Sequence, residues 1–183
     1  MLVELALMGT FLIVMTLGLL EIGSAWNDHQ AVTGASRSGA RVGSQRATEG
    51  DADQQMLLAI EAALGQIDPT ISRVVVFEAD VNGDMPAACL GASAGYVGGA
   101  NCNVYDATSL TNITTPGWWG SGTACGSADG NWCAPTDRVN ELHTATYLGV
   151  HVEVTRQYVT GLFGTGTHTL SETTVMRLEP DLE

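Results

Sequence analysis

The chain contains no lysine, and its basic residues are seven arginines against twenty aspartates and glutamates. The formal net charge at pH 7 is therefore −13. Proteins bind nucleic acids by neutralising phosphates with lysine and arginine, so this charge balance argues against a nucleic acid as a partner. Proline is scarce as well, and none lies between Trp26 and Ala47. No proline therefore stops a helix from running through this segment.

Residue patterns of common catalytic and metal sites are also scarce. No glycine-rich loop ends in Lys-Ser or Lys-Thr, as a phosphate-binding loop would. The four histidines lack metal-ligand spacing with the cysteines, and zinc sites use close pairs such as Cys-x-x-Cys, which the chain does not have. No nucleophile–base pair stands out. We therefore expect no enzyme activity, no catalytic residue and no cofactor.

What the chain does have is a long apolar run, from Leu2 to Ile22, whose only charged residues are Glu4 and Glu21. A helix over Leu2 to Leu20 would span roughly 28 Å, close to the hydrocarbon thickness of a bilayer. A carboxylate inside such a segment costs at least about 2.5 kcal/mol, so it usually has a partner or a function. Glu4 therefore requires an explanation.

Three hypotheses explain this run. A secretory signal peptide would carry basic residues before it, but no lysine or arginine precedes it here, and we expect the segment to be retained. An ordinary membrane anchor would let Glu4 reach the headgroups. The third hypothesis is a subunit whose helix lies first in a membrane and later in the core of a filament. There Glu4 would meet the terminal amine of a neighbouring copy, and we favour this interpretation.

A family resemblance supports the third hypothesis. Both acids, several glycines and a Ser-Arg-x-Gly-Ala-Arg segment stand in the order that is typical of TadE-like proteins, in the tight-adherence (Tad) branch of type IV pilins. The match covers about the first forty-five residues. It rests on Leu2-Val3-Glu4-Leu5-Ala6-Leu7, Gly18-Leu19-Leu20-Glu21-Ile22-Gly23, Gln30-Ala31-Val32 and Ala35-Ser36-Arg37-Ser38-Gly39-Ala40-Arg41. A weaker similarity lies in the segment from Val175 to Pro180.

The resemblance implies a prepilin that a prepilin peptidase cuts in the inner (cytoplasmic) membrane and that pilus assembly machinery adds to a filament. Its partners would be copies of itself or other pilins, and its head would lie outside the cell. One departure from the family pattern is the position of the acid. Type IV pilins usually carry it at the fifth mature residue, whereas here it is residue 4. The processing site therefore stays open.

We expect the N-terminal helix, assigned to residues 1–48, to continue beyond Gly23. Small residues recur every four positions, which places them on one face and lets a second helix approach closely. They are Ala31, Ala35, Gly39 and Gly43. We interpret this face as an assembly seam that the head does not touch; the alternative is a flexible linker. Arg37 and Arg41 point to another side, where they either pair with acids such as Glu21 of adjacent subunits or face solvent.

The remaining residues, 49–183, are expected to form a small α+β head with an antiparallel sheet. Asp51 or Asp53 would cap an amphipathic helix that ends at Gly65 and lies on the sheet. Its apolar side would hold Met56, Leu57, Ile60, Ala63 and Leu64. Strands are expected over 73–79, 145–160 and 167–178, where β-branched or alternating residues recur. Residues 163–166 read as a hairpin turn.

Residues 84–137 are the least regular stretch, rich in glycine and tryptophan, and hold all four cysteines. An even number of cysteines in an exported chain indicates two disulfides that order such loops. Four cysteines allow three connectivities. We favour the sequential pairs, which close short loops, Cys89–Cys102 and Cys125–Cys133. Trp118, Trp119 and Trp132 are expected to pack this lobe; the alternative is an aromatic binding surface.

Two weaker sites complete the candidates. Asp80, Asn82 and Asp84 space three oxygen ligands two residues apart, as a calcium loop does, but the glycine and the bidentate glutamate of an EF-hand are not in place. A strand-ending acidic turn explains them as well. Asn112-Ile113-Thr114 is a glycosylation sequon.

The sequence thus predicts a pilin or minor pilin of a cell-surface filament with a disulfide-stapled head. The rival hypothesis is a membrane-anchored binding module or adhesin that does not polymerise.

Overall fold

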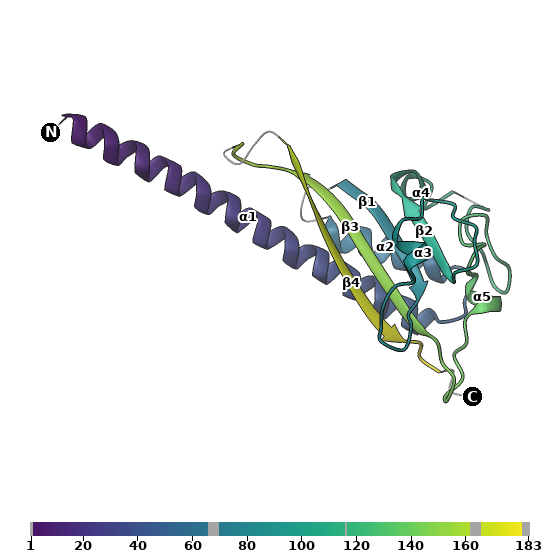
Figure 1. The fold of residues 1–183 in the computed structure, drawn as a ribbon. Helices are drawn as coiled ribbons and strands as arrows, with labels where there is room; N and C mark the ends of the chain where they lie inside the picture. Colours follow the sequence, from purple (N-terminus) through teal and green to yellow (C-terminus); the bar gives the residue numbers. More distant parts are fainter. Residues whose placement is uncertain (1, 66–69, 116, 162–165, 181–183) are drawn as a thin grey trace.

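The computed structural model describes residues 2–65, 70–115, 117–161 and 166–180. Helix α1 (Leu2–Arg46) forms one continuous rod whose first half projects beyond the head, while its second half packs on the head (Figure 1). It ends where Ala47 takes a positive φ of 37°, with the Ala47 N–H still donating to the Gly43 carbonyl. The predicted extension of the apolar helix to about residue 47 is therefore confirmed.

The head is built on one antiparallel sheet with the strand order β2-β1-β3-β4. Its strands are β1 (Thr70–Glu78), β2 (Cys102–Asp106), β3 (Tyr147–Gln157) and β4 (Thr167–Arg177). Val74 pairs with Val152, and Val150 pairs with Thr174. The three predicted strands are confirmed, whereas β2 lies inside the stretch predicted to be irregular. The proposed turn at 163–166 falls mainly outside the described residues.

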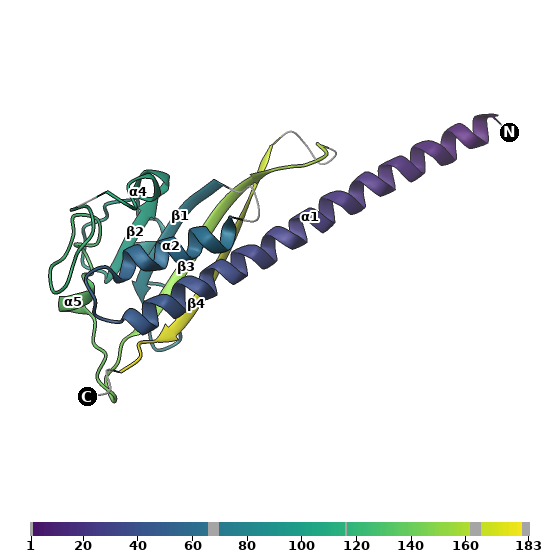
Figure 2. The same ribbon diagram turned by 180° about the vertical axis from the view of Figure 1, so that it is seen from behind.

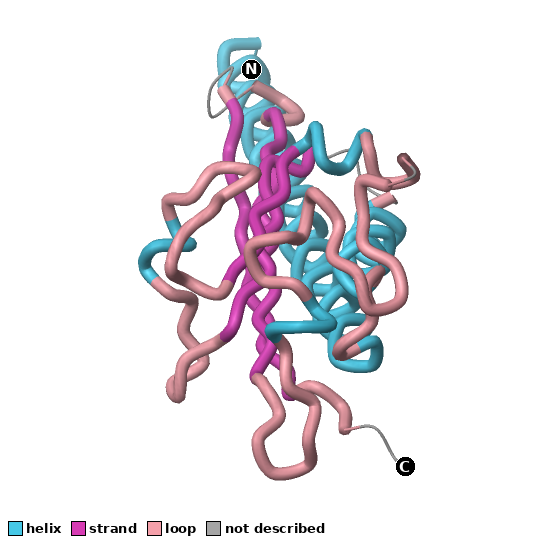
Figure 3. The backbone as a smooth tube through the Cα atoms, turned by 90° about the vertical axis from the view of Figure 1, so that its right-hand side faces the viewer, coloured by secondary structure: helices cyan, strands magenta, loops and turns pink. Residues whose placement is uncertain are grey.

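The second half of α1 and helix α2 (Ala52–Leu64) cover one face of the sheet (Figures 2 and 3). The β-branched side chains that alternate along β3 point to this face, and Val150, Val152 and Val154 are all buried. The predicted apolar side of α2 is confirmed, since four of its five residues are buried and Ala63 packs partly against them. α1 and α2 are thus part of one hydrophobic core with the sheet.

The opposite face of the sheet is covered by the loops between β1 and β2. Val75, Phe77 and Val104 are buried there with a disulfide between Cys89, on the short helix α3 (Ala87–Leu90), and Cys102. The second disulfide joins Cys125 to Cys133. It precedes helix α5 (Ala134–Asp137), and helix α4 (Ala107–Thr111) follows β2 directly. The predicted α+β class and the sequential disulfide pairing are both confirmed.

A buried polar network ties α2 to the loop lobe. The Asp53 carboxylate accepts hydrogen bonds from the Tyr105 hydroxyl (2.5 Å), the Asn103 amide (2.8 Å) and the Arg138 guanidinium (2.5 Å). Burial, followed by the neighbouring Asp53 charge, raises the pKa of Tyr105 well above its usual value. Arg138 lies over the ring of Trp132, 4.3 Å from its centroid. Through these side-chain hydrogen bonds, the network joins α2 to β2 and to the segment around Arg138.

The expected capping of α2 by an aspartate side chain is wrong. Asp51 stands at the N-cap position, but its carboxylate binds Arg46 and Gln55 and makes no capping hydrogen bond. Asp53 lies inside the helix and is buried in the network just described. The Asp53 charge is compensated by the paired cation of Arg138, and its position in the first turn of α2 favours a negative charge as well.

Candidate assembly helix and its junction with the head

The first half of α1 is an apolar rod that the head leaves uncovered. Val3 is 73% exposed and Ile22 is 64% exposed, and most large apolar side chains between them are exposed to a similar degree. The helix is long and apolar enough to cross a membrane. A contiguous apolar surface of this size marks a contact with a membrane or with another protein. This rod is therefore the candidate functional surface of the chain.

Glu4 lies in the first turn of α1, with its side chain exposed. An acid at this position is favoured by the partial positive charge at the helix N-terminus. The structure thus places Glu4 near the free end of the rod (Figure 1). Its role in assembly stays a prediction.

Glu21, at the other end of the apolar run, is buried and binds the β3–β4 connection of its own chain. Its carboxylate accepts hydrogen bonds from the backbone N–H of Val159 (2.9 Å), the N–H of Thr160 (2.7 Å) and the Thr160 hydroxyl (2.6 Å). From the sequence, Arg37 and Arg41 either pair with acids such as Glu21 of adjacent subunits or face solvent. Within this chain, the hairpin already satisfies the Glu21 carboxylate with three donors.

One ion pair and one histidine–carboxylate contact continue this junction along α1, and no sequence pattern indicated either of them. Asp28 is buried and pairs with Arg156 at the end of β3. His29 Nε2 lies 3.0 Å from the Glu172 carboxylate on β4, and its ring stacks on that of the exposed Trp26. Glu21, Asp28 and His29 follow one another along the side of α1 that faces β3 and β4. They hold the helix against the hairpin where the rod leaves the head.

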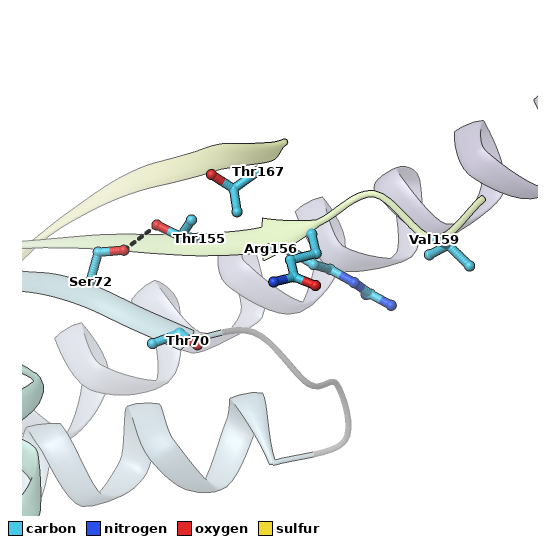
Figure 4. Close-up of a pocket in the computed structure, with 7 residues that line it drawn as sticks. Thr70, Ser72, Thr155, Arg156, Val159 and Thr167 are labelled. Atoms are coloured by element: carbon cyan, nitrogen blue, oxygen red, sulfur yellow. Dashed lines mark hydrogen bonds between the residues drawn. The ribbon is translucent and has the colours of Figure 1, made fainter. Parts of the chain in front are cut away.

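A hollow of about 640 Å³ lies beside this junction (Figure 4). Its polar lining comes mostly from hydroxyl groups, and two of them, on Ser72 and Thr155, hydrogen-bond to each other. Arg156 contributes to the wall, but its guanidinium turns to α1 and binds Asp28. The hollow therefore offers a ligand no free charged group among these lining residues.

The small-residue seam faces the chain's own head. A Cβ on Gly39 would lie 2.7 Å from Ile60 of α2, and one on Gly43 would lie 2.2 Å from Met56 Sδ and 2.4 Å from Leu148 of β3. Ala35 is fully buried in the same core, and Ala31 packs against its edge. The predicted close approach of a second helix is confirmed, but that helix is α2 of the same subunit. The expectation that the head does not touch the seam is wrong, because the sheet and α2 fold onto it.

Arg37 and Arg41 lie on the exposed side of α1. They stand two residues from Gly39, about 200° around the helix, and so point away from the core. Among the described residues neither arginine pairs with a carboxylate, unlike Arg46, Arg73, Arg138 and Arg156. The outward face of α1 thus carries two positive charges that the fold does not use.

The calcium candidate is an acidic turn. The Asp80 carboxylate accepts hydrogen bonds from the N–H groups of Asn82 and Asp84, both at 2.8 Å, and these bonds lower its pKa. The residues that the structure describes contain no group of three or more His, Cys, Asp or Glu side chains placed to hold a metal ion. Asn112 donates its side-chain N–H to the Thr108 carbonyl, and its glycosylation stays a prediction.

The tryptophans and one serine motif have structural explanations. Trp119 and Trp132 are buried, and Trp118 packs against the same core, as expected for a small loop-rich lobe.

Residues 91–95 read Gly-Ala-Ser-Ala-Gly and so match the Gly-x-Ser-x-Gly pattern of serine hydrolases. They lie in turns after α3, without the strand–turn–helix context of that motif, and none of the described histidines bonds to Ser93.

Comparison with known proteins finds a relationship for the helix alone. A long apolar N-terminal helix that could cross a membrane, joined to a disulfide-bonded α+β head, is the class of protein that these features define. Residues 1–41 match the family model described as TadE-like protein, which confirms the resemblance and indicates a membrane-anchored protein associated with the Tad pilus. No curated protein and no solved structure matches the chain. The matched segment runs from the apolar rod to Arg41, and the head lies outside it.

Proposed function

We propose that this chain is a structural subunit, a pilin or minor pilin, of a Tad-like filament on the cell surface. The observation that carries the proposal is the apolar rod, which stands clear of the head and is exposed along its length. The hydrophobic core of the described head takes no side chain from this rod, and two disulfides staple the head in addition. The rod therefore serves contacts outside the subunit.

The rod is apolar around its whole circumference. Consecutive residues such as Phe11, Leu12, Ile13, Val14 and Met15 are all about half or more exposed. A helix that is hydrophobic all round is typical of a membrane span or of a helix surrounded by other helices. Both environments suit a pilin: the bilayer holds the rod before assembly, and the rods of neighbouring copies surround it in the filament.

Glu4 makes the second environment specific. In an apolar environment a carboxylate is costly unless a positive charge lies within a few ångströms. The terminal amine of a neighbouring subunit would supply that charge when the rods stack. Prepilin peptidase and the pilus assembly machinery are the further partners of this proposal, and the subunit has a structural rather than a catalytic role.

The experiment compares Glu4→Gln with Glu61→Gln, which changes an exposed acid on α2 and serves as the matched control. We expect both variants to reach normal abundance in the cytoplasmic membrane. We expect only Glu4→Gln to lower the fraction of the subunit found in sheared filaments, measured by immunoblotting and electron microscopy. Wild-type incorporation of Glu4→Gln would contradict the role of Glu4. If the unmodified chain occurs in no filament, it is an anchored binding module instead.

A further inference from the structure

The outward face of α1 has features that the subunit's own core does not explain. Arg37 and Arg41 stand one turn apart on this face, flanked by the exposed residues Gly34 and Gln45. A Cβ on Gly34 would meet nothing within 4 Å, in contrast to Gly39 and Gly43, which pack against the head. A glycine inside a helix costs about 1 kcal/mol relative to alanine. Gly34 therefore leaves room for a close neighbour on this face without serving the fold.

The other five arginines are engaged within the subunit. Arg46, Arg73, Arg138 and Arg156 pair with carboxylates, and Arg177 donates a hydrogen bond to the Leu142 carbonyl. Arg37 and Arg41 are therefore the arginines to which the described part of the subunit offers neither a carboxylate nor a hydrogen-bond acceptor, whereas Arg177 has an acceptor but no carboxylate partner. Copies of a chain with a net charge of −13 repel one another. Close packing of such copies requires contacts in which positive charge meets negative charge.

The complementary negative charge lies at the end of the head that is remote from the rod. Backbone hydrogen bonds join Ala79 to Tyr147 and Leu178 to Thr146, so the loops that follow β1 and precede β3 meet the end of β4 there (Figure 1). These segments carry four exposed acids that pair with no arginine among the described residues, and one arginine, Arg177 at the end of β4, lies among them. The four acids are Asp80, Asp84, Glu141 and Glu179; we name this set the acidic end.

We propose that Arg37 and Arg41 of one subunit bind the acidic end of the head of a second copy of this chain. The inference rests on the proposed function and names the contact that joins the heads, in addition to the stacking of the rods. The two surfaces are different parts of the subunit, so the contact is head-to-tail. Each added subunit leaves one free surface of each type, so a contact of this kind continues into an open helical filament when its rotation does not close a ring.

Lipid headgroups do not explain the two arginines. Arg37 lies sixteen residues after Glu21, which corresponds to about 24 Å along the helix beyond the apolar run. Electrostatic attraction to a charged surface is largely screened beyond about 8 Å at physiological ionic strength. An upright helix therefore holds both guanidinium groups outside the reach of the membrane, at the level of the head.

The test is an exchange of charges between the two surfaces. The first variant is Arg37→Glu with Arg41→Glu, the second is Asp84→Arg with Glu141→Arg, and the third combines all four substitutions. Glu179 is left unchanged because its N–H bonds to Ser44, one turn from Arg41, so that a change there would mix effects within and between subunits. Glu61→Arg reverses an exposed acid elsewhere on the head and is the control.

We expect each double variant to lower the filament-incorporated fraction about tenfold or more, because the reversals place like charges opposite one another, which costs more than about one factor of ten. The fourfold variant should recover to within about twofold of the original, because it restores opposite charges. The control should assemble normally. Circular dichroism of each purified full-length variant checks that the head is folded.

Site-specific crosslinking provides a second measurement. All four native cysteines are in disulfides, so Arg41→Cys combined with Asp84→Cys introduces the only free thiols. Mild oxidation should give a ladder of covalent multimers from filaments but monomers from membranes. Normal assembly of Arg37→Glu with Arg41→Glu overturns this inference and leaves the proposed function intact, as does a fourfold variant that stays defective. A chain that is absent from all filaments overturns both.

Discussion

Replacing Gly43 with alanine should destabilise the head, whereas the same replacement at Gly34 should stabilise it slightly. Both glycines lie in α1, so both substitutions gain the same helix propensity, about 1 kcal/mol. They differ in their surroundings: the added methyl group meets open space at Gly34, but at Gly43 it would lie 2.2 Å from Met56 Sδ and 2.4 Å from Leu148 Cδ2. Comparing the two variants therefore isolates the cost of overpacking.

The size of the effect follows from these contacts. Met56 is unbranched and can change its rotamer, but Leu148 is fully buried in β3, between β1 and β4, and has little room to move. Extra methyl groups in a packed core typically cost about 1–3 kcal/mol. Gly43→Ala should thus lose about 0–2 kcal/mol of unfolding free energy and Gly34→Ala should gain up to about 1 kcal/mol. The difference between them should be about 1–3 kcal/mol.

The assay is urea unfolding of the full-length chain in detergent micelles. Trp119 and Trp132 are buried in the head, so tryptophan fluorescence reports on head unfolding. The midpoint should shift between the two variants with an unchanged slope, because the surface exposed on unfolding stays the same. Equal midpoints for Gly34→Ala and Gly43→Ala would refute the packing of α1 against α2 and β3. That result would indicate that the small-residue seam packs against a neighbouring subunit in the filament instead.

Two further predictions concern the junction and the sheet. Glu21→Ala should speed hydrogen exchange at the N–H groups of Val159 and Thr160 while leaving β1 amides unchanged, because the carboxylate is their acceptor; unchanged exchange would show that it does not hold the hairpin. Burial, followed by the charge of Arg73, lowers the pKa of His151, despite Glu153 and Glu172 nearby. The stability that neutral His151 contributes is present above its unfolded pKa of about 6.5 and is lost as the pH falls through its folded pKa. His151→Gln should therefore flatten the decline of the urea midpoint between about pH 7 and pH 5. The same slope in both proteins would argue against a neutral, buried His151.

Much of the secondary structure followed from the sequence alone, and the sequence favoured one of the three possible disulfide pairings. The apolar run and the absence of proline predicted α1, and the alternation of Val150, Val152 and Val154 predicted β3. These patterns are local, because helix and strand periodicity places side chains on one face whatever the fold around them. Cys89–Cys102 and Cys125–Cys133 close short loops, and this short separation along the chain favoured their pairing.

Strand β2 was missed because its five residues, Cys102–Asp106, show no alternation of apolar and polar side chains. Both of its faces are covered: Val104 lies under the loop lobe, and Tyr105 lies under α2, where it bonds Asp53. A short strand that is buried on both sides has no period-two signal. It forms because it pairs with β1, some thirty residues earlier in the chain.

The direction of the α1 contacts was settled by tertiary structure. The spacing of Ala35, Gly39 and Gly43 indicates that another helix approaches closely. This spacing does not distinguish a helix of a neighbouring subunit from α2 of the same chain, which is the helix found there. Glu21 finds its donors 138 and 139 residues away, on the β3–β4 connection. Contacts between residues so far apart leave no periodic trace in either segment, so the fold alone decided that Glu21 and the seam hold the head, while Arg37 and Arg41 remain on the outside.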